Sequence, residues 1–112
     1  MLGDGTQEKP YLAVADLVAG ILHVWQRCDE RLNIFNLGAT TRSKVSDIAR
    51  IVVDEAPGPA EISYTGGSRG WIGDVPKFAY DISAITALGW EPTMSSDEAV
   101  RQSARAIWSE QQ

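Results

Sequence analysis

The sequence predicts a small mixed α/β domain in which amphipathic helices outnumber a few short strands. Apolar residues recur at three- and four-residue spacing in three segments, which is typical of helices with one buried face. Short apolar runs bounded by glycine or proline lie between these segments, as short strands do. A chain of 112 residues can form one hydrophobic core, so we expect a single domain over residues 1–112.

The three helical segments have recognisable ends. Asp16 is the expected N-cap of the first helix. The second helix is predicted to begin near Ser43 and to stop before the Pro-Gly-Pro segment at 57–59. Ser95 and Glu98 form a capping-box pattern that predicts the start of the last helix.

Two strands and a shorter helix complete the predicted order of elements. Residues 33–38 form an apolar run that ends in glycine, which predicts a buried strand, and residues 61–64 predict a second strand. A glycine-rich loop covers 66–76, after which Asp81 opens a short helix that ends near Gly89. The helices offer more apolar surface than so little sheet can cover, so we expect a missing neighbour.

Composition excludes several classes of function. Ten basic residues against fifteen acidic ones, with a net charge of -5, argue against nucleic acid as a partner. No apolar run reaches about 18 residues and the N-terminus has no secretion signal, so we expect no membrane partner and a cytoplasmic location. With Cys28 and His23 each alone of its kind, no metal site and no intrachain disulfide are expected.

The glycine-rich loop allows a dinucleotide-binding interpretation. Gly67, Gly70 and Gly73 follow the predicted strand at the spacing of a dinucleotide fingerprint. That fingerprint requires a helix opening at the last glycine and an acidic residue about 20 positions further on. Here Asp-Val-Pro follows the third glycine at once. This interpretation is therefore the weaker one, and NAD binding to the chain alone would support it.

The same loop also carries groups that suit a phosphate together with a base or sugar. Its glycines permit close backbone approach, Arg69 offers a planar fork of donors, and Trp71 offers a flat apolar face. The alternative is a surface loop in which Trp71 covers the core and Arg69 is solvated. Composition leaves both interpretations open.

Four blocks of residues, in the same order, resemble the extended short-chain dehydrogenase/reductase family of NAD-dependent nucleotide-sugar epimerases and dehydratases, such as the UDP-galactose 4-epimerases. The resemblance is to the C-terminal part that follows the Rossmann core, and it runs from Gly3 to about Arg105. The blocks are the Gly-Asp-Gly-Thr-Gln segment at 3–7 with Lys9, Tyr11 and 14–16; the Asn-Leu-Gly segment at 36–38 with Ser43; the Gly-Asp-Val segment at 73–75; and Asp81 with the Leu-Gly-Trp-Glu-Pro segment at 88–92.

The resemblance implies that this part holds the nucleotide diphosphate of the sugar substrate. Lys9 stands where the family commonly has a basic residue that meets the diphosphate, and Arg69 is the second expected diphosphate contact. Asp74 stands at the place of an acidic residue near the ribose. Tyr11 and Trp71 complete the candidate substrate-binding residues.

The family's catalytic parts are absent from the sequence. Hydride chemistry in the family needs a Rossmann domain for NAD and a Tyr-x-x-x-Lys pair. The residues four positions after the three tyrosines are Ala15, Ser68 and Ala84. We therefore expect no catalytic residues, no cofactor bound by this chain alone, and NAD as the cofactor of a longer parent.

The implied partners follow from this fragment character. They are a weakly bound nucleotide-diphosphate sugar, the missing Rossmann domain, and a second copy in a homodimer or larger assembly. The competing hypothesis is a non-catalytic structural or interaction module derived from the same fold. The sequence leaves open the sugar, the base and the choice among epimerisation, dehydration and reduction.

Overall fold

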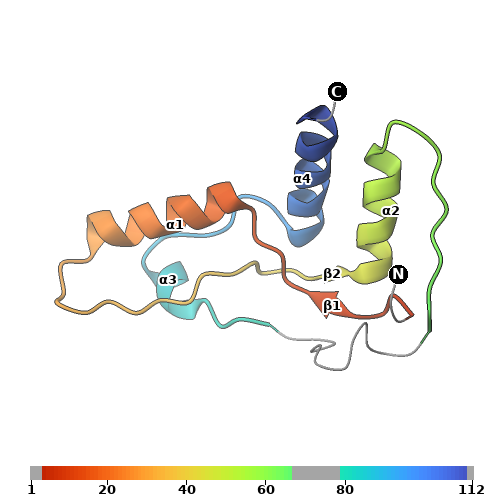
Figure 1. The fold of residues 1–112 in the computed structure, drawn as a ribbon. Coiled ribbons are helices and arrows are strands. Elements are labelled where there is room, and N and C mark those ends of the chain that lie inside the picture. The colour runs from red at the N-terminus through yellow and green to blue at the C-terminus, as the bar shows by residue number, and fades with distance from the viewer. Residues whose placement is uncertain (1–3, 67–78, 111–112) are drawn as a thin grey trace.

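The protein's structure, a computed structural model, describes residues 4–66 and 79–110. Within these residues four helices accompany one two-stranded antiparallel sheet, which confirms the predicted mixed fold with few and short strands (Figure 1). The elements in chain order are β1 (Glu8–Lys9), α1 (Val14–Arg27), β2 (Ser43–Lys44), α2 (Val45–Glu55), α3 (Ser83–Ala87) and α4 (Ser96–Glu110).

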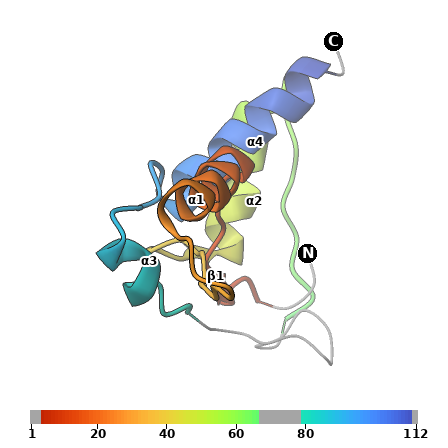
Figure 2. The same cartoon turned by 90° about the vertical axis from the view of Figure 1, so that its left-hand side faces the viewer.

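The elements form two groups on either side of the strand pair. Helices α2 and α4 rise side by side in the same direction from β2, whereas α1 extends away from them above α3 (Figure 1). Viewed from the side that α1 points toward, α3 and α2 lie on different sides of α1 (Figure 2). The strands thus stand at the junction of the two groups.

The hydroxyl of Ser96 joins β1, β2 and α4 at that junction. This fully buried oxygen accepts hydrogen bonds from Ser43 Oγ at 2.6 Å and from Tyr11 N at 2.9 Å. The backbone N–H of Ser96 donates to Thr41 Oγ1 at 2.9 Å. Because unpaired polar groups are costly in a dry interior, these bonds fix how α4 starts against both strands.

Asp16 connects α1 to the segment before α4, and it is not the N-cap that the sequence predicted. The N-cap of α1 is Ala13, and Asp16 lies in the first turn with its side chain buried. Its carboxylate accepts from Thr93 Oγ1 at 2.7 Å and from the N–H groups of Thr93 and Met94 at 3.0 and 3.3 Å. Those donors satisfy a carboxylate that could not otherwise be buried.

The predicted short helix and its glycine end are confirmed. Ser83 N donates to Asp81 Oδ1 at 2.9 Å, and this bond lowers the pKa of Asp81 below its usual value. At the other end Gly89 has φ +103°, and Trp90 N bonds back to Ile85 O at 3.2 Å. This is a Schellman ending, which needs a left-handed residue and therefore favours glycine.

Trp90 is buried by this turn and packs against the middle of α1. A Cβ added at Gly20 would lie 3.1 Å from Trp90 Cε2 and would also overlap the Leu37 side chain. Beside it, His23 Nε2 donates to Leu88 O at 2.9 Å, since a carbonyl oxygen can only accept. The inner face of α1 thus holds the end of α3.

Helix α2 begins and ends, and helix α4 begins, within a residue or two of the predicted positions. Helix α2 starts just after Ser43 and stops before Pro57. Helix α4 starts after Ser95, whose Oγ accepts from Glu98 N at 3.2 Å, so the capping prediction is confirmed on that side. Both helices place apolar residues on the sides that face each other.

The two predicted strands at 33–38 and 61–64 are wrong. Both segments lack regular structure, and Ile34, expected to be buried, is 79% exposed. A strand forms only where a neighbour accepts its backbone hydrogen bonds, and no neighbouring strand lies beside either segment in the described part of the chain.

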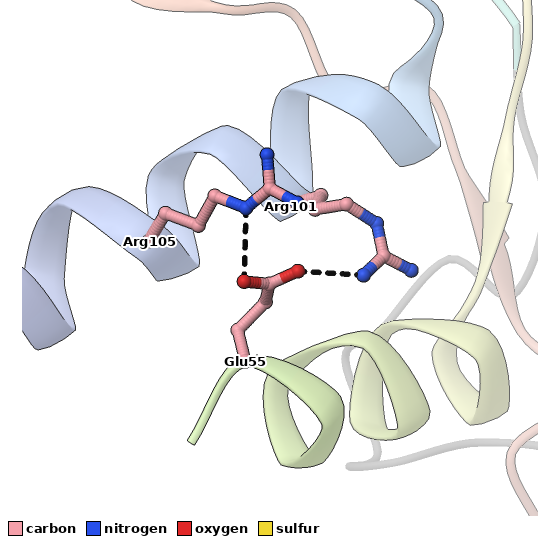
Figure 3. A network of polar contacts seen from close by, with 3 residues as sticks. All are labelled: Glu55, Arg101 and Arg105. Carbon is pink, nitrogen blue, oxygen red and sulfur yellow. Dashed lines mark hydrogen bonds and ion pairs between the residues drawn. The ribbon is translucent and has the colours of Figure 1, made fainter. Parts of the chain in front are cut away.

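A single carboxylate links the upper part of α2 to α4. Glu55 Oε1 accepts from Arg101 Nη1 at 2.7 Å and Glu55 Oε2 accepts from Arg105 Nε at 2.9 Å (Figure 3). The hydrogen bond from Arg105, followed by that from Arg101, holds the pKa of Glu55 below its usual 4.5. Arg101 is therefore part of the fold.

Replacing Ser96 with alanine is expected to lower the free energy of unfolding by about 1–3 kcal/mol, because Ser43 Oγ and Tyr11 N lose their buried acceptor. Urea denaturation measures this. Ser109→Ala, an exposed change in the same helix, should have little effect. The double variant Ser43→Ala/Ser96→Ala should cost less than the sum of the single changes, and strict additivity would contradict the coupling.

Glu55→Gln is expected to lower Tm at pH 7 and to change it little at low pH. Because the pKa of Glu55 is lower in the folded than in the unfolded state, its carboxylate stabilises the fold at pH values above its usual pKa of 4.5. This stabilisation is lost as the pH falls through the lowered pKa of the folded state. Thermal unfolding followed by circular dichroism across this range measures the difference. The exposed Glu91→Gln is the matched control, and equal Tm values for both variants at pH 7 would refute the role of Glu55.

Candidate functional site

The candidate site starts at the N-terminal turn that leads to Lys9. Asp4 Oδ1 accepts from Thr6 Oγ1 at 2.6 Å and from Thr6 N at 3.0 Å, and these two bonds lower the pKa of Asp4. Gly5 between them has φ +82°, and a Cβ there would lie 2.7 Å from Tyr64 Cε1. The Asp-Gly-Thr sequence is therefore explained by a tight turn that also receives an aromatic ring.

This turn is tied to the start of α2. Ser46 N donates to Gly5 O at 3.0 Å, and Val45 N donates to Gln7 O at 2.9 Å. These bonds satisfy two N–H groups of the first helical turn, which have no partner inside the helix. The chain then continues into β1, where Lys9 pairs with Ser43. The position of Lys9 is thus set by the start of α2.

Lys9 and Tyr11 come close to the same buried serine, but the Tyr11 side chain turns toward the helices. Lys9 O lies 3.4 Å from Ser96 Oγ, and Tyr11 N lies 2.9 Å from it. The Tyr11 ring lines an open groove of about 280 Å³ between α2 and α4. Its other wall residues are mostly apolar: Leu12, Ile48, Val52, Ala99, Val100, Ser103, Ala104 and Ile107.

Several charged side chains lie on the two strands and next to them. Glu8 lies opposite Lys44 in the register, and its carboxylate lies 3.8 Å from Arg42 Nη2. Lys9 on the neighbouring position of β1 is half-buried. The two strands and Arg42, just before β2, thus carry three basic side chains and one acidic one, with Lys9 on the opposite face of the sheet from Glu8 and Lys44.

Arg69, Trp71 and Asp74, with the glycines at 67, 70 and 73, lie outside the described residues. The structure does describe both flanks of that segment. Before it, the Tyr64 ring lies against Gly5. After it, the Tyr80 ring lies against Gly38, where an added Cβ would be 2.9 Å from Tyr80 Cδ2. The residues on both sides of this segment therefore pack against glycines of the blocks at 3–7 and 36–38.

A long hydrogen bond of 3.5 Å from Asn36 Nδ2 to Asp81 O joins the second block to the fourth. These contacts were not predicted from the sequence, which assigned Gly38 to the end of a strand and to the second block. The glycine at position 38 was itself a signal in the sequence, because a residue whose backbone packs against an aromatic ring has no room for a side chain. Sequence alone does not say which ring it accepts.

A wider groove of about 530 Å³ lies along α1, remote in sequence from Lys9. It runs between α1 and residues 28–37, and its apolar wall includes Ile21, Trp25, Phe35 and Leu37. Among the described residues no group of three or more His, Cys, Asp or Glu side chains could hold a metal ion. In that same part of the chain no helix is long and apolar enough to cross a membrane.

Comparison with known proteins gives matches over most of the chain. No family model matches the sequence. The dTDP-L-rhamnose 4-epimerase of Burkholderia thailandensis is 29% identical over 98 residues, which are 87% of this chain and 26% of the relative. The UDP-glucuronic acid decarboxylase 2 of Arabidopsis thaliana is 31% identical over 94 residues, 83% of this chain and 20% of the relative.

Solved structures agree in fold. A crystal structure of a UDP-galactose 4-epimerase superposes with a TM-score of 0.78 and 32% identity over 94% of this chain and 35% of its own. Over most of its length the chain is similar to part of the NAD-dependent epimerases of the short-chain dehydrogenase/reductase family. The UDP-glucose 4-epimerase of Thermotoga maritima, solved with UDP-glucose, shares the fold with a TM-score of 0.80 at 24% identity, over 100% of this chain and 35% of that one.

The chain matches only part of each family member. It spans about a quarter or less of the curated relatives and about a third of the solved ones. The resemblance first seen in four short blocks is confirmed by these matches. Three of those blocks lie largely in the described residues, and they are the ones whose glycines and buried polar groups hold the fold together.

Proposed function

We propose that this chain is the C-terminal, nucleotide-diphosphate-sugar-binding part of an NAD-dependent nucleotide-sugar epimerase, similar to UDP-glucose and UDP-galactose 4-epimerases. The observation that carries the proposal is that a tyrosine ring on each side of residues 67–78 lies against a glycine of a resembling block. Tyr64 lies on Gly5 of the first block, and Tyr80 lies on Gly38 of the second. The candidate residues at 69, 71 and 74 thus belong to a segment with one end held at Gly5, in the turn that leads to Lys9, and the other end held at Gly38.

Each candidate residue has a role that its chemistry suits. Lys9 and Arg69 would hold the diphosphate, because charge-assisted hydrogen bonds to phosphate oxygens are the strong ones. Asp74 would accept from ribose hydroxyls. Trp71 would supply a flat wall near the nucleotide, whereas the Tyr11 ring faces the groove between α2 and α4. Relatives solved with UDP-glucose and with NAD+ and UDP support this class of ligand.

Affinity for the nucleotide sugar should be weak. Binding sites of this kind enclose most of the ligand, and one lobe supplies only one wall. The entropic cost of association is paid in full while many contacts are missing. A complete site would need the lobe that carries NAD in the relatives.

The described residues do not fit NAD themselves. A dinucleotide needs a strand–helix–strand unit with parallel strands, and the only sheet in residues 4–66 and 79–110 is a two-stranded antiparallel pair. No step of hydride transfer is therefore assigned to this chain. The alternative function, a non-catalytic interaction module, is favoured by one observation, which is the large apolar area exposed on α1.

Arg69→Ala and Lys9→Gln are each expected to weaken UDP binding about tenfold, since each removes one cationic donor worth about 1.5 kcal/mol or more. Isothermal calorimetry measures the affinities. The control is the exposed Arg31→Ala, which removes a cationic side chain outside the proposed site. Equal affinities for all variants would remove Lys9 and Arg69 from the site. Absence of binding at millimolar UDP would favour the interaction module.

The purified chain is expected to show no epimerase or dehydrogenase turnover with NAD and nucleotide sugars, because it has neither a dinucleotide fold in its described residues nor a Tyr-x-x-x-Lys pair. A coupled spectrophotometric assay measures this. Turnover that copurifies with the chain and is abolished by a mutation in it would overturn the expectation. This outcome is independent of whether UDP binds.

A further inference from the structure

The hydroxyl of Ser96 holds the chain on both sides of Pro10, directly beside Lys9. It donates to Lys9 O at 3.4 Å and accepts from Tyr11 N at 2.9 Å and from Ser43 Oγ at 2.6 Å. A serine hydroxyl has one proton to donate and two lone pairs that accept. These three bonds therefore use its full capacity, and none of it remains for a ligand.

The proline at position 10 makes this support necessary. Pro10 has no N–H to donate to a neighbouring strand, and β1 accordingly ends at Lys9. The N-terminal side of Lys9 is held by the strand pair and by the bond from Val45 N to Gln7 O. On the carbonyl side, the bonds to Ser96 take over from the strand pair.

Ser96 is itself a fixed point of the domain. It is fully buried as the first residue of α4, and its N–H donates to Thr41 Oγ1 at 2.9 Å. Farther along the helix, Glu55 of α2 accepts from Arg101 and Arg105 (Figure 3). Because α4 is anchored at these two places, the Ser96 hydroxyl has little freedom to follow a displaced strand.

We propose that Ser96 is a positioning residue for the nucleotide diphosphate, because it holds the backbone from which the Lys9 side chain reaches a phosphate. This role rests on the proposed function, in which Lys9 meets the diphosphate. A lysine ammonium is carried on a flexible four-carbon stem, so the contact gains when the base of the stem is already fixed. Since its hydroxyl is buried and fully used, Ser96 acts through Lys9 and does not touch the ligand.

A double-mutant cycle measured by isothermal calorimetry tests this role. Ser96→Ala should weaken UDP binding roughly threefold or more, because the backbone of Lys9 is then less firmly held. In a Lys9→Gln background the same change should cause no further loss, since the ammonium through which Ser96 acts is gone. A general loosening of the domain would instead lower the affinity by the same factor in both backgrounds.

Thr93→Val is the matched control, because it removes a hydroxyl from a different part of the domain. This hydroxyl donates to Asp16 Oδ1 at 2.7 Å, so its loss should lower the free energy of unfolding without removing a bond to β1. The UDP affinity of this variant should equal that of the original chain. Circular dichroism checks that every variant is folded at the temperature of the measurement.

The possible results distinguish the role of Ser96 from the role of Lys9. Equal losses in both backgrounds, or no loss from Ser96→Ala while Lys9→Gln weakens binding, would overturn the role of Ser96 and leave Lys9 in the site. A matching loss from Thr93→Val would do the same. If Lys9→Gln has no effect on UDP affinity, Lys9 leaves the proposed site and the role of Ser96 is overturned with it.

Amide hydrogen exchange gives a second test that needs no change at Ser96. Binding through Lys9 and the hold on β1 are linked, so saturating UDP should slow exchange of the Tyr11 amide, which donates to Ser96 Oγ. The slowing should exceed that of the Thr93 amide, which donates to Asp16 Oδ2 at 3.0 Å, and it should be lost in Lys9→Gln at equal saturation. Equal slowing of both amides would indicate stabilisation of the whole domain and would overturn the proposal.

Discussion

The buried hydroxyl of Ser96 is the contact on which the arrangement of this domain depends. Three stretches of chain that are far apart in sequence meet at this residue: β1 with Tyr11, residues 41–43, and the start of α4. The apolar core is small, with Ile85 and Trp90 among its largest members. In a small domain with so little apolar burial, satisfied buried polar groups decide which of several loose packings is the unique one.

The sequence blocks that resemble the epimerase family have structural roles in the described residues. Gly5 and Gly38 each receive a tyrosine ring against their backbone, and Gly89 takes the left-handed conformation that ends α3. Asp16 and Asp81 each accept backbone donors. Such requirements explain why these residue types stand at these places without any reference to substrate. The proposed substrate role therefore falls to Lys9 and to the segment between Tyr64 and Tyr80.

The helices could be predicted from the sequence because each shows its apolar side by local spacing. The strands could not, since residues 33–38 and 61–64 have strand-like composition but no neighbouring strand in the described residues. Asp16 was predicted as a cap because its sequence position allows it; that its carboxylate reaches Thr93 and Met94 depends on tertiary packing. For the candidate site, sequence placed Lys9 and Tyr11 together, but it did not show that the Tyr11 ring faces the groove between α2 and α4.

Helix α4 is held unevenly along its length. Its first residue is fixed by the Ser96 bonds, and its middle is held to α2 through Arg101 and Arg105. Beyond Arg105, Trp108 lies at an open groove formed by the last turn of α2 and residues 56–60. Local opening is easiest where few contacts must be broken. The rate of amide hydrogen exchange should therefore rise along α4 from its N-terminus to its C-terminus. The helix would unwind from its C-terminal end while the first turn at Ser96 stays folded.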